Sequence, residues 1–196
     1  MFARTLLARR VALLAVLASL AIALPAAAQY VTFPRLGASA SLDHHDGFIE
    51  IHGDEVFELH ILVMPPEGEP TLGHDYQQFE WVLLEPCCGG SATVLDIDYN
   101  PALTHEGTLL SGITSTLQDG QECLTGEMIH LATLTLQMDG QTLRGTYFIL
   151  AGPFGLASDC AGEGVLMTDM QLAVDYFPDI TPVEGTTFSD VKRIFR

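Results

Sequence analysis

The sequence predicts an all-β fold, an antiparallel β-sandwich of the jelly-roll or immunoglobulin-like kind. Short runs in which apolar and polar residues alternate recur along the chain. Turn-forming pairs such as Asp46-Gly47 and Asp119-Gly120 separate them. Between residue 29 and the last ten positions there is no long helical period. We therefore expect one β-sandwich domain, over residues 29–180, with eight or nine strands.

A secretory signal precedes this domain. Residues 1–10 carry three arginines and no acid, and an apolar stretch of about 14 residues leads to Pro25 and three alanines. A membrane span needs about 20 apolar residues, which this stretch lacks. We expect residues 1–28 to form a helical signal peptide, cleaved after Ala28. The protein is then secreted or periplasmic, exported by the general secretory route, with no membrane span.

The predicted strands follow in order. Alternation marks strands at residues 56–64, 79–83 and 92–100, and alternate side chains of a strand share one face. Glu58 and His60 are expected on the polar face of the first strand. The residues expected on the apolar faces are Phe57, Leu59, Ile61 and Val63, then Phe79, Trp81 and Leu83, then Leu95, Ile97 and Tyr99.

Two further β-rich runs, 128–138 and 143–150, are separated by Asp139-Gly140 and its flanks. Asp-Gly favours the type I′ turn of a hairpin, so we expect these two runs to pair. His130 then lies on a strand near a sheet edge. A last strand over about 165–177 has Met170, Leu172, Val174 and Tyr176 in phase.

The segment 181–196 differs from the rest. Its apolar residues at 188, 191, 194 and 195 have helical spacing, and its basic residues lie toward its end, where a helix dipole favours them. We expect a short amphipathic helix that packs against the sandwich or serves as a recognition tag.

The order of these features resembles the cohesin-like and carbohydrate-binding-like β-sandwich modules of secreted bacterial proteins. The resemblance lies in the strand FELHILV, the strand with Phe79-Glu80-Trp81, the segment ATVLDIDYNP and the late strand MIHLATLTLQM. It covers about 120 residues and implies a jelly-roll that binds a protein or glycan partner and performs no chemistry.

The strongly negative net charge limits the classes of ligand that the protein can bind. The formal net charge is −17, and removal of the signal, with three arginines and no acid, makes it −20. Such a surface repels phosphate, which excludes nucleic acid and anionic lipid as ligands. No nucleophile motif and no carboxylate pair with a distinctive spacing occurs, so we predict that the chain is not an enzyme.

A divalent metal is the alternative function. Segment 43–74 is rich in histidine and acid, and imidazole and carboxylate bind zinc or copper. The candidate ligands there are His44, His45 and His52. Asp96 and Asp98 share a strand face on which calcium could bind, although the sequence is not an EF-hand because Pro101 stands where its turn needs glycine. The other interpretation, with no cofactor, is that these are ordinary surface residues.

The four cysteines, Cys87, Cys88, Cys123 and Cys160, are expected to form two disulfides in an oxidising compartment. One possibility is a bond between the adjacent Cys87 and Cys88, at a turn before Gly89-Gly90, together with Cys123–Cys160. The crossed pairings are the others.

We therefore expect an exported, non-enzymatic β-sandwich that binds an extracellular protein or glycan, or has a structural role at the cell surface or in the periplasm. The single tryptophan, Trp81, is in phase with Phe79 and Leu83 and is expected in the core. This weakens the glycan version more than the protein version, because glycan platforms use exposed aromatic rings.

Overall fold

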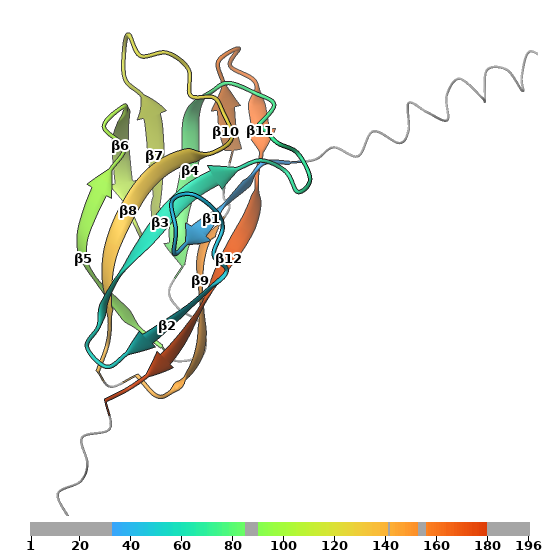
Figure 1. Cartoon of the computed structure of the whole chain (residues 1–196). Coiled ribbons are helices and arrows are strands. Elements are labelled where there is room, and N and C mark those ends of the chain that lie inside the picture. Colours follow the sequence, from blue (N-terminus) through green and yellow to red (C-terminus); the bar gives the residue numbers. More distant parts are fainter. Residues whose placement is uncertain (1–32, 85–89, 141, 153–155, 180–196) are drawn as a thin grey trace, which may run out of the picture. The chain divides into compact units, whose positions relative to one another are not determined.

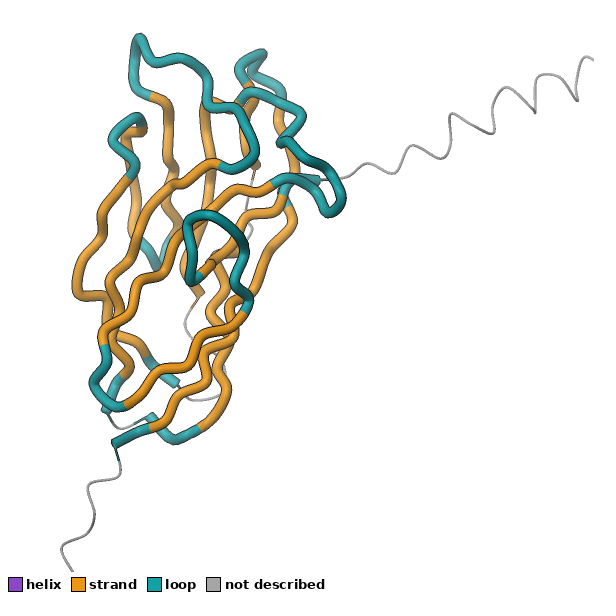
Figure 2. The backbone as a smooth tube through the Cα atoms, viewed as in Figure 1, coloured by secondary structure: helices purple, strands orange, loops and turns teal. Residues whose placement is uncertain are grey.

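The computed structural model describes residues 33–84, 90–140, 142–152 and 156–179. These residues form twelve strands and no helix (Figure 2). The predicted signal helix, residues 1–28, and the predicted tail helix, residues 181–196, lie outside the described residues. Among the described residues, no helix is long and apolar enough to cross a membrane.

The strands are β1 (Arg35–Ser39), β2 (Phe48–His52), β3 (Val56–Met64), β4 (Tyr76–Leu84), β5 (Ala92–Tyr99), β6 (Leu103–Thr108), β7 (Gly112–Leu117), β8 (Ile129–Met138), β9 (Gly145–Gly152), β10 (Leu156–Asp159), β11 (Gly164–Leu166) and β12 (Thr168–Phe177). They form two layers, which confirms the predicted sandwich (Figure 1). One layer has the order β6-β7-β4-β10-β11, and the other has the order β9-β12-β1-β3-β8-β5, with β2 paired to the second half of β12.

Strand β4 connects the layers. Its first part pairs with β7 and β10, from Tyr76 to Trp81, and its last residues, Val82 to Leu84, pair with β9. The path of hydrogen-bonded strands is therefore continuous from one layer to the other.

The core lies where the inner faces meet. Phe57, Leu59, Ile61 and Val63 are buried, as their alternation predicts, and so are Phe79, Trp81, Met170, Leu172, Val174 and Tyr176. Leu83 is half-buried and packs against this cluster.

Most neighbouring strands are antiparallel, but β12 pairs in parallel with β1 and then with β2. The β1 pairing brings the two backbones close at Gly37, where an added Cβ would lie 2.4 Å from Cβ of Met170. A side chain at position 37 would force the strands apart.

The predicted hairpin at Asp139-Gly140 is wrong. β8 pairs with β3 and β5, whereas β9 pairs with β12 and β4. The connection after Asp139 therefore joins strands that have different neighbours, and the Asp-Gly signal reports a local turn but not the partner of each strand. His130 lies on β8, which is one strand from the edge of the sheet, between β3 and the terminal strand β5.

The predicted burial of Leu95 is also wrong. The pairing of β5 with β8 shifts between Val94 and Asp96, which is a β-bulge. The bulge reverses the alternation, so Leu95 is exposed, whereas Val94, Ile97 and Tyr99 pack against the core.

Core packing on β3 yields a matched prediction. Leu59→Ala should lower the free energy of unfolding by about 2–5 kcal/mol, because it leaves a cavity at a fully buried position. Val56→Ala, on the same strand but half-exposed, should change it by less than about 1 kcal/mol. Urea denaturation measures both, and equal losses would contradict the assignment of the buried face.

Candidate functional site

The outer surface of β4, β7 and β6 is a flat polar face. The register places Gln78 beside Thr116 and Thr104 in one row, and Glu80 beside Thr114 and Glu106 in the next. Residues directly opposite in neighbouring strands share a face, and the alternate residues Phe79 and Ser115 are buried inside. We call the residues Gln78, Glu80, Thr104, Glu106, Thr114 and Thr116 the Thr/Glu face.

A hollow of about 240 Å³ opens beside this face. Its lining residues include Glu80, Trp81, Val82, Ser111 and Thr114. The turn that forms one side of the hollow depends on glycine: an added Cβ on Gly107, whose φ is 107°, would lie 2.1 Å from the Gly112 carbonyl oxygen. The hollow is therefore a concave position between β4, β7 and the β6–β7 turn, with Glu80 as the acidic residue of its lining.

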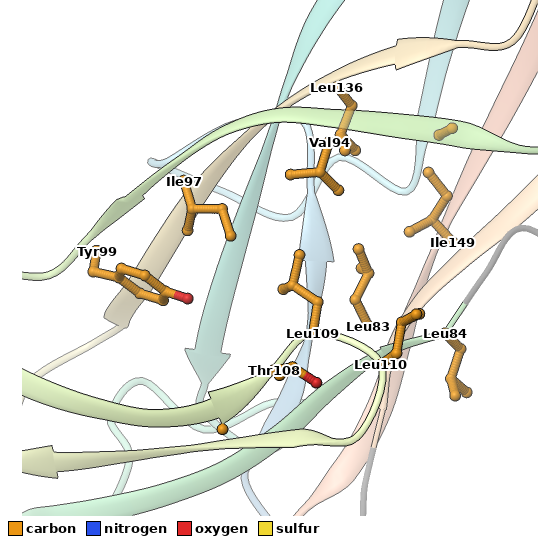
Figure 3. Close-up of a pocket in the computed structure, with 12 residues that line it drawn as sticks. Leu83, Leu84, Val94, Ile97, Tyr99, Thr108, Leu109, Leu110, Leu136 and Ile149 are labelled. Atoms are coloured by element: carbon orange, nitrogen blue, oxygen red, sulfur yellow. The ribbon is translucent and has the colours of Figure 1, made fainter.

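A larger pocket of about 700 Å³ opens between β5 and the β6–β7 turn. Figure 3 shows side chains of β5, such as Val94 and Ile97, facing Leu109 and Leu83 across it. Its lining contains no Asp, Glu, His, Lys, Arg or Cys, and its side-chain polar groups are the hydroxyls of Tyr99 and Thr108. Apart from these two hydroxyls, the side chains that line the pocket are apolar.

Inside the core beneath the Thr/Glu face, three side chains form a hydrogen-bonded chain. Trp81 Nε1 donates to Ser115 Oγ over 2.9 Å, and Ser115 Oγ lies 2.9 Å from His105 Nδ1. The His105 ring stacks on Tyr99, with ring centroids 4.1 Å apart. Because the indole N–H can only donate, the Ser115 hydroxyl can donate its own proton to a neutral His105 ring. Burial lowers the pKa of His105, although the hydrogen bond with the Asn100 backbone raises it in part.

Two histidines, His60 and His130, form a cluster with Thr133 on the other layer. His60 Nδ1 and His130 Nε2 lie 3.0 and 2.9 Å from the same hydroxyl, that of Thr133. Sequence reasoning placed His60 on the polar face of its strand, yet only 6% of it is exposed. One hydroxyl proton serves one imidazole, so the other must donate, which suits two neutral rings.

The causes of the pKa shifts agree with this arrangement. Burial lowers the pKa of His60 more than the Glu58 charge raises it. Burial and the neighbouring His60 lower the pKa of His130. The hydrogen bond with the Ala132 backbone and the charge of Asp98 raise it by less. Both histidines thus resist protonation in the folded protein.

The histidines predicted as metal ligands do not converge. His44 Nε2 lies 3.0 Å from Asp46 Oδ1, His45 Nε2 lies 3.3 Å from the Gln171 carbonyl oxygen, and His52 stacks on Phe177. In the described part of the chain, no three His, Cys, Asp or Glu side chains are grouped so that they could hold a metal ion.

Asp96 and Asp98 lie on β5, in register with Thr135 and Thr133 of β8. Asn100, two residues after Asp98, is hydrogen-bonded within the protein: its Nδ2 donates to the His130 carbonyl over 2.7 Å, and its Oδ1 accepts from the Ala102 amide. The asparagine thus stabilises the turn after β5.

Cys123 and Cys160 form a disulfide, as one of the predicted pairings has it, with their Cα atoms 6.4 Å apart. Cys87 and Cys88 lie outside the described residues. The bond joins the β7–β8 connection to the end of β10. The same corner has backbone hydrogen bonds between Tyr76 and Leu124, and from the Cys160 amide to the Asp75 carbonyl. The beginning of β4 is thereby fastened to two loops.

The disulfide closes a loop with a sequence separation of 37. The double variant Cys123→Ser/Cys160→Ser should lose about 2–4 kcal/mol of unfolding free energy, because the unfolded chain gains freedom. Chemical denaturation without reductant measures this. Stability equal to that of the parent would contradict a structural role for the bond.

The histidine clusters predict a pH dependence of stability. In the unfolded chain these histidines titrate near pH 6.5, whereas in the folded chain their pKa is lower. As the pH falls below about 6.5, the unfolded state binds more protons, so the free energy of unfolding decreases.

Urea denaturation at about pH 7 and about pH 5 should show this loss, and His130→Gln should reduce it. His45→Gln removes a histidine outside the clusters and should leave the loss unchanged. If His130→Gln and His45→Gln have the same effect, the clusters are not its source.

Comparison with known proteins identifies the fold. No protein-family model and no curated protein matches the sequence. A cohesin module from a Clostridium perfringens family 33 glycoside hydrolase has a TM-score of 0.54 and 9% identity, covering 76% of this chain and all of that one. The third ScaB cohesin of R. flavefaciens, in complex with a group 1 dockerin, has a TM-score of 0.53 and 14% identity, covering 75% of this chain and 96% of that one. A type I cohesin–dockerin complex from Clostridium thermocellum has a TM-score of 0.51 and 9% identity, covering 74% and 98%. The chain therefore has a cohesin-like β-sandwich fold, as the resemblance predicted.

Proposed function

We propose that this chain is an exported, non-enzymatic module that binds a protein partner through its Thr/Glu face. The observation that carries the proposal is the hollow beside Glu80 on that face. A concave position beside an acidic residue accepts a protruding side chain of a partner, and such positions contribute much of the energy of protein interfaces.

The chemistry of the face favours a protein. Threonine side chains are stiff at χ1, so they lose little entropy when a partner covers them. Glu80 and Glu106 flank Thr114, which favours a partner that presents lysine or arginine. Trp81 is 1% exposed and cannot serve as a platform for a sugar ring, which favours protein over glycan.

The fold supports the same role. Two of the similar solved structures are complexes of a cohesin with a dockerin. The signal peptide predicted at residues 1–28 supports an extracellular or periplasmic setting for the interaction.

A capture experiment tests the proposal. Immobilised chain 29–196 should enrich one or a few proteins from the secreted fraction of the source organism. The double variant Glu80→Lys/Glu106→Lys should reduce that enrichment at least about tenfold, because like charges then face each other. Quantitative mass spectrometry measures the enrichment.

The matched control is Glu58→Lys, an exposed glutamate on β3 in the other layer. It should capture the same proteins as the parent. Equal capture by the Glu80/Glu106 variant, or no enriched protein at all, would refute the proposed interface.

A further inference from the structure

Two exposed phenylalanines flank Ala173 on the outer surface of the layer that contains β12. Ala173 of β12 pairs with Phe48 of β2 on one side and with Phe148 of β9 on the other. Phe48 is 52% exposed and Phe148 is 38% exposed. The two exposed rings and the small alanine between them form an apolar row across the three strands, which we call the trough. An exposed apolar row is a candidate docking surface.

An acidic row borders this trough. Two residues further along β12, Asp175 pairs with Glu50 on β2 and with Thr146 on β9. The Thr146 hydroxyl donates to Asp175 Oδ1 over 2.6 Å. Glu50 is exposed and makes no side-chain contact with a basic group among the described residues.

On the same surface, a basic side chain of the chain itself packs on an aromatic ring. In the last row, the Arg144 guanidinium lies over the Phe177 ring, 4.4 Å from its centroid, and His52 also stacks on that ring. Aromatic rings and carboxylates along β12 thus suit a ligand that is apolar on one side and basic beside it.

One segment of this chain has that chemistry. On a helix with 100° per residue, Phe188, Val191, Ile194 and Phe195 fall within an arc of about 120°. Lys192 and Arg196 follow on one side of the arc, and three of the eight basic residues of the sequence lie within 192–196. The segment therefore combines an apolar stripe with a basic border.

The lengths also fit. The last described residue is Asp179, just after the end of β12 at Phe177. Ala173 lies four residues earlier, about 13 Å along the strand. Residues 180–186 can span up to about 23 Å when extended, and a ten-residue helix is about 15 Å long. The segment can therefore fold back and cover both the acidic row and the trough.

We propose that residues 187–196 dock as an amphipathic helix on the outer surface of β2, β12 and β9. The apolar stripe covers Phe48, Ala173 and Phe148, and Lys192 and Arg196 lie against Glu50 and Asp175. The proposal concerns the layer opposite the Thr/Glu face, so it stands or falls independently of the proposed function.

Trypsin gives a direct test, because it cuts after Lys192 and Arg193, within the docked segment. In chain 29–196, docking should slow this cleavage. Phe48→Ser/Phe148→Ser and, separately, Glu50→Lys should each accelerate it about tenfold, because cleavage follows the undocked fraction. Mass spectrometry of the released peptides gives the rates, and thermal melting confirms that each variant is folded. Glu50→Lys keeps the test valid if the double variant does not fold.

Two controls are matched to these changes. Leu110→Ser alters a 71% exposed leucine at the apolar pocket, and Glu58→Lys reverses an exposed charge on β3. Both should be cleaved at the parent rate. Three results would overturn the proposal: parent-like rates in the Phe48/Phe148 and Glu50 variants, acceleration by Leu110→Ser, which would place the segment in the pocket, or protection that disappears on dilution, which would assign the trough to a second copy.

Discussion

The architecture depends on one strand that takes part in both layers. β4 pairs with β7 and β10 up to Trp81 and with β9 from Val82 onward. Its inward residues Tyr76, Phe79 and Trp81 are among the largest buried side chains, while Gln78 and Glu80 contribute to the Thr/Glu face. Packing of this strand thus positions the proposed interface, and the Cys123–Cys160 bond fastens the corner where the strand begins.

The sequence predicted those strands whose two faces differ. β4, β12 and the first residues of β3 alternate between a buried and a polar side, so the pattern identified these strands and their inward residues. From Leu59 to Val63, β3 is buried on both sides, which the alternation did not predict. The pattern missed β1, β2, β6, β7 and β10, because RLGAS, FIEIH, LTHEGT, GITSTL and LASD are only four to six residues long, too short for a clear alternation. Alternation also carries no information about pairing, so neither the bulge at Leu95 nor the separation of β8 from β9 could be foreseen.

The candidate site shows the same limit. The Thr/Glu face needs three strands in register, and two of them, β6 and β7, were not predicted, so the row Glu80–Thr114–Glu106 was invisible in the sequence. The histidines were evident in the sequence, but their contacts were not. The metal hypothesis rested on His44, His45 and His52, which have separate partners in the structure. The more buried His60, His105 and His130 are hydrogen-bonded to serine or threonine.

The central claim is that a protein partner covers the Thr/Glu face. Methyl cross-saturation NMR of the labelled chain bound to its unlabelled captured partner tests it most directly, since threonine methyl groups occur on both layers. Signals of Thr104, Thr114 and Thr116 should lose intensity when the partner is irradiated, while those of Thr133 and Thr135 on β8 should not. Loss confined to Thr133 and Thr135, or at no threonine, would contradict the account.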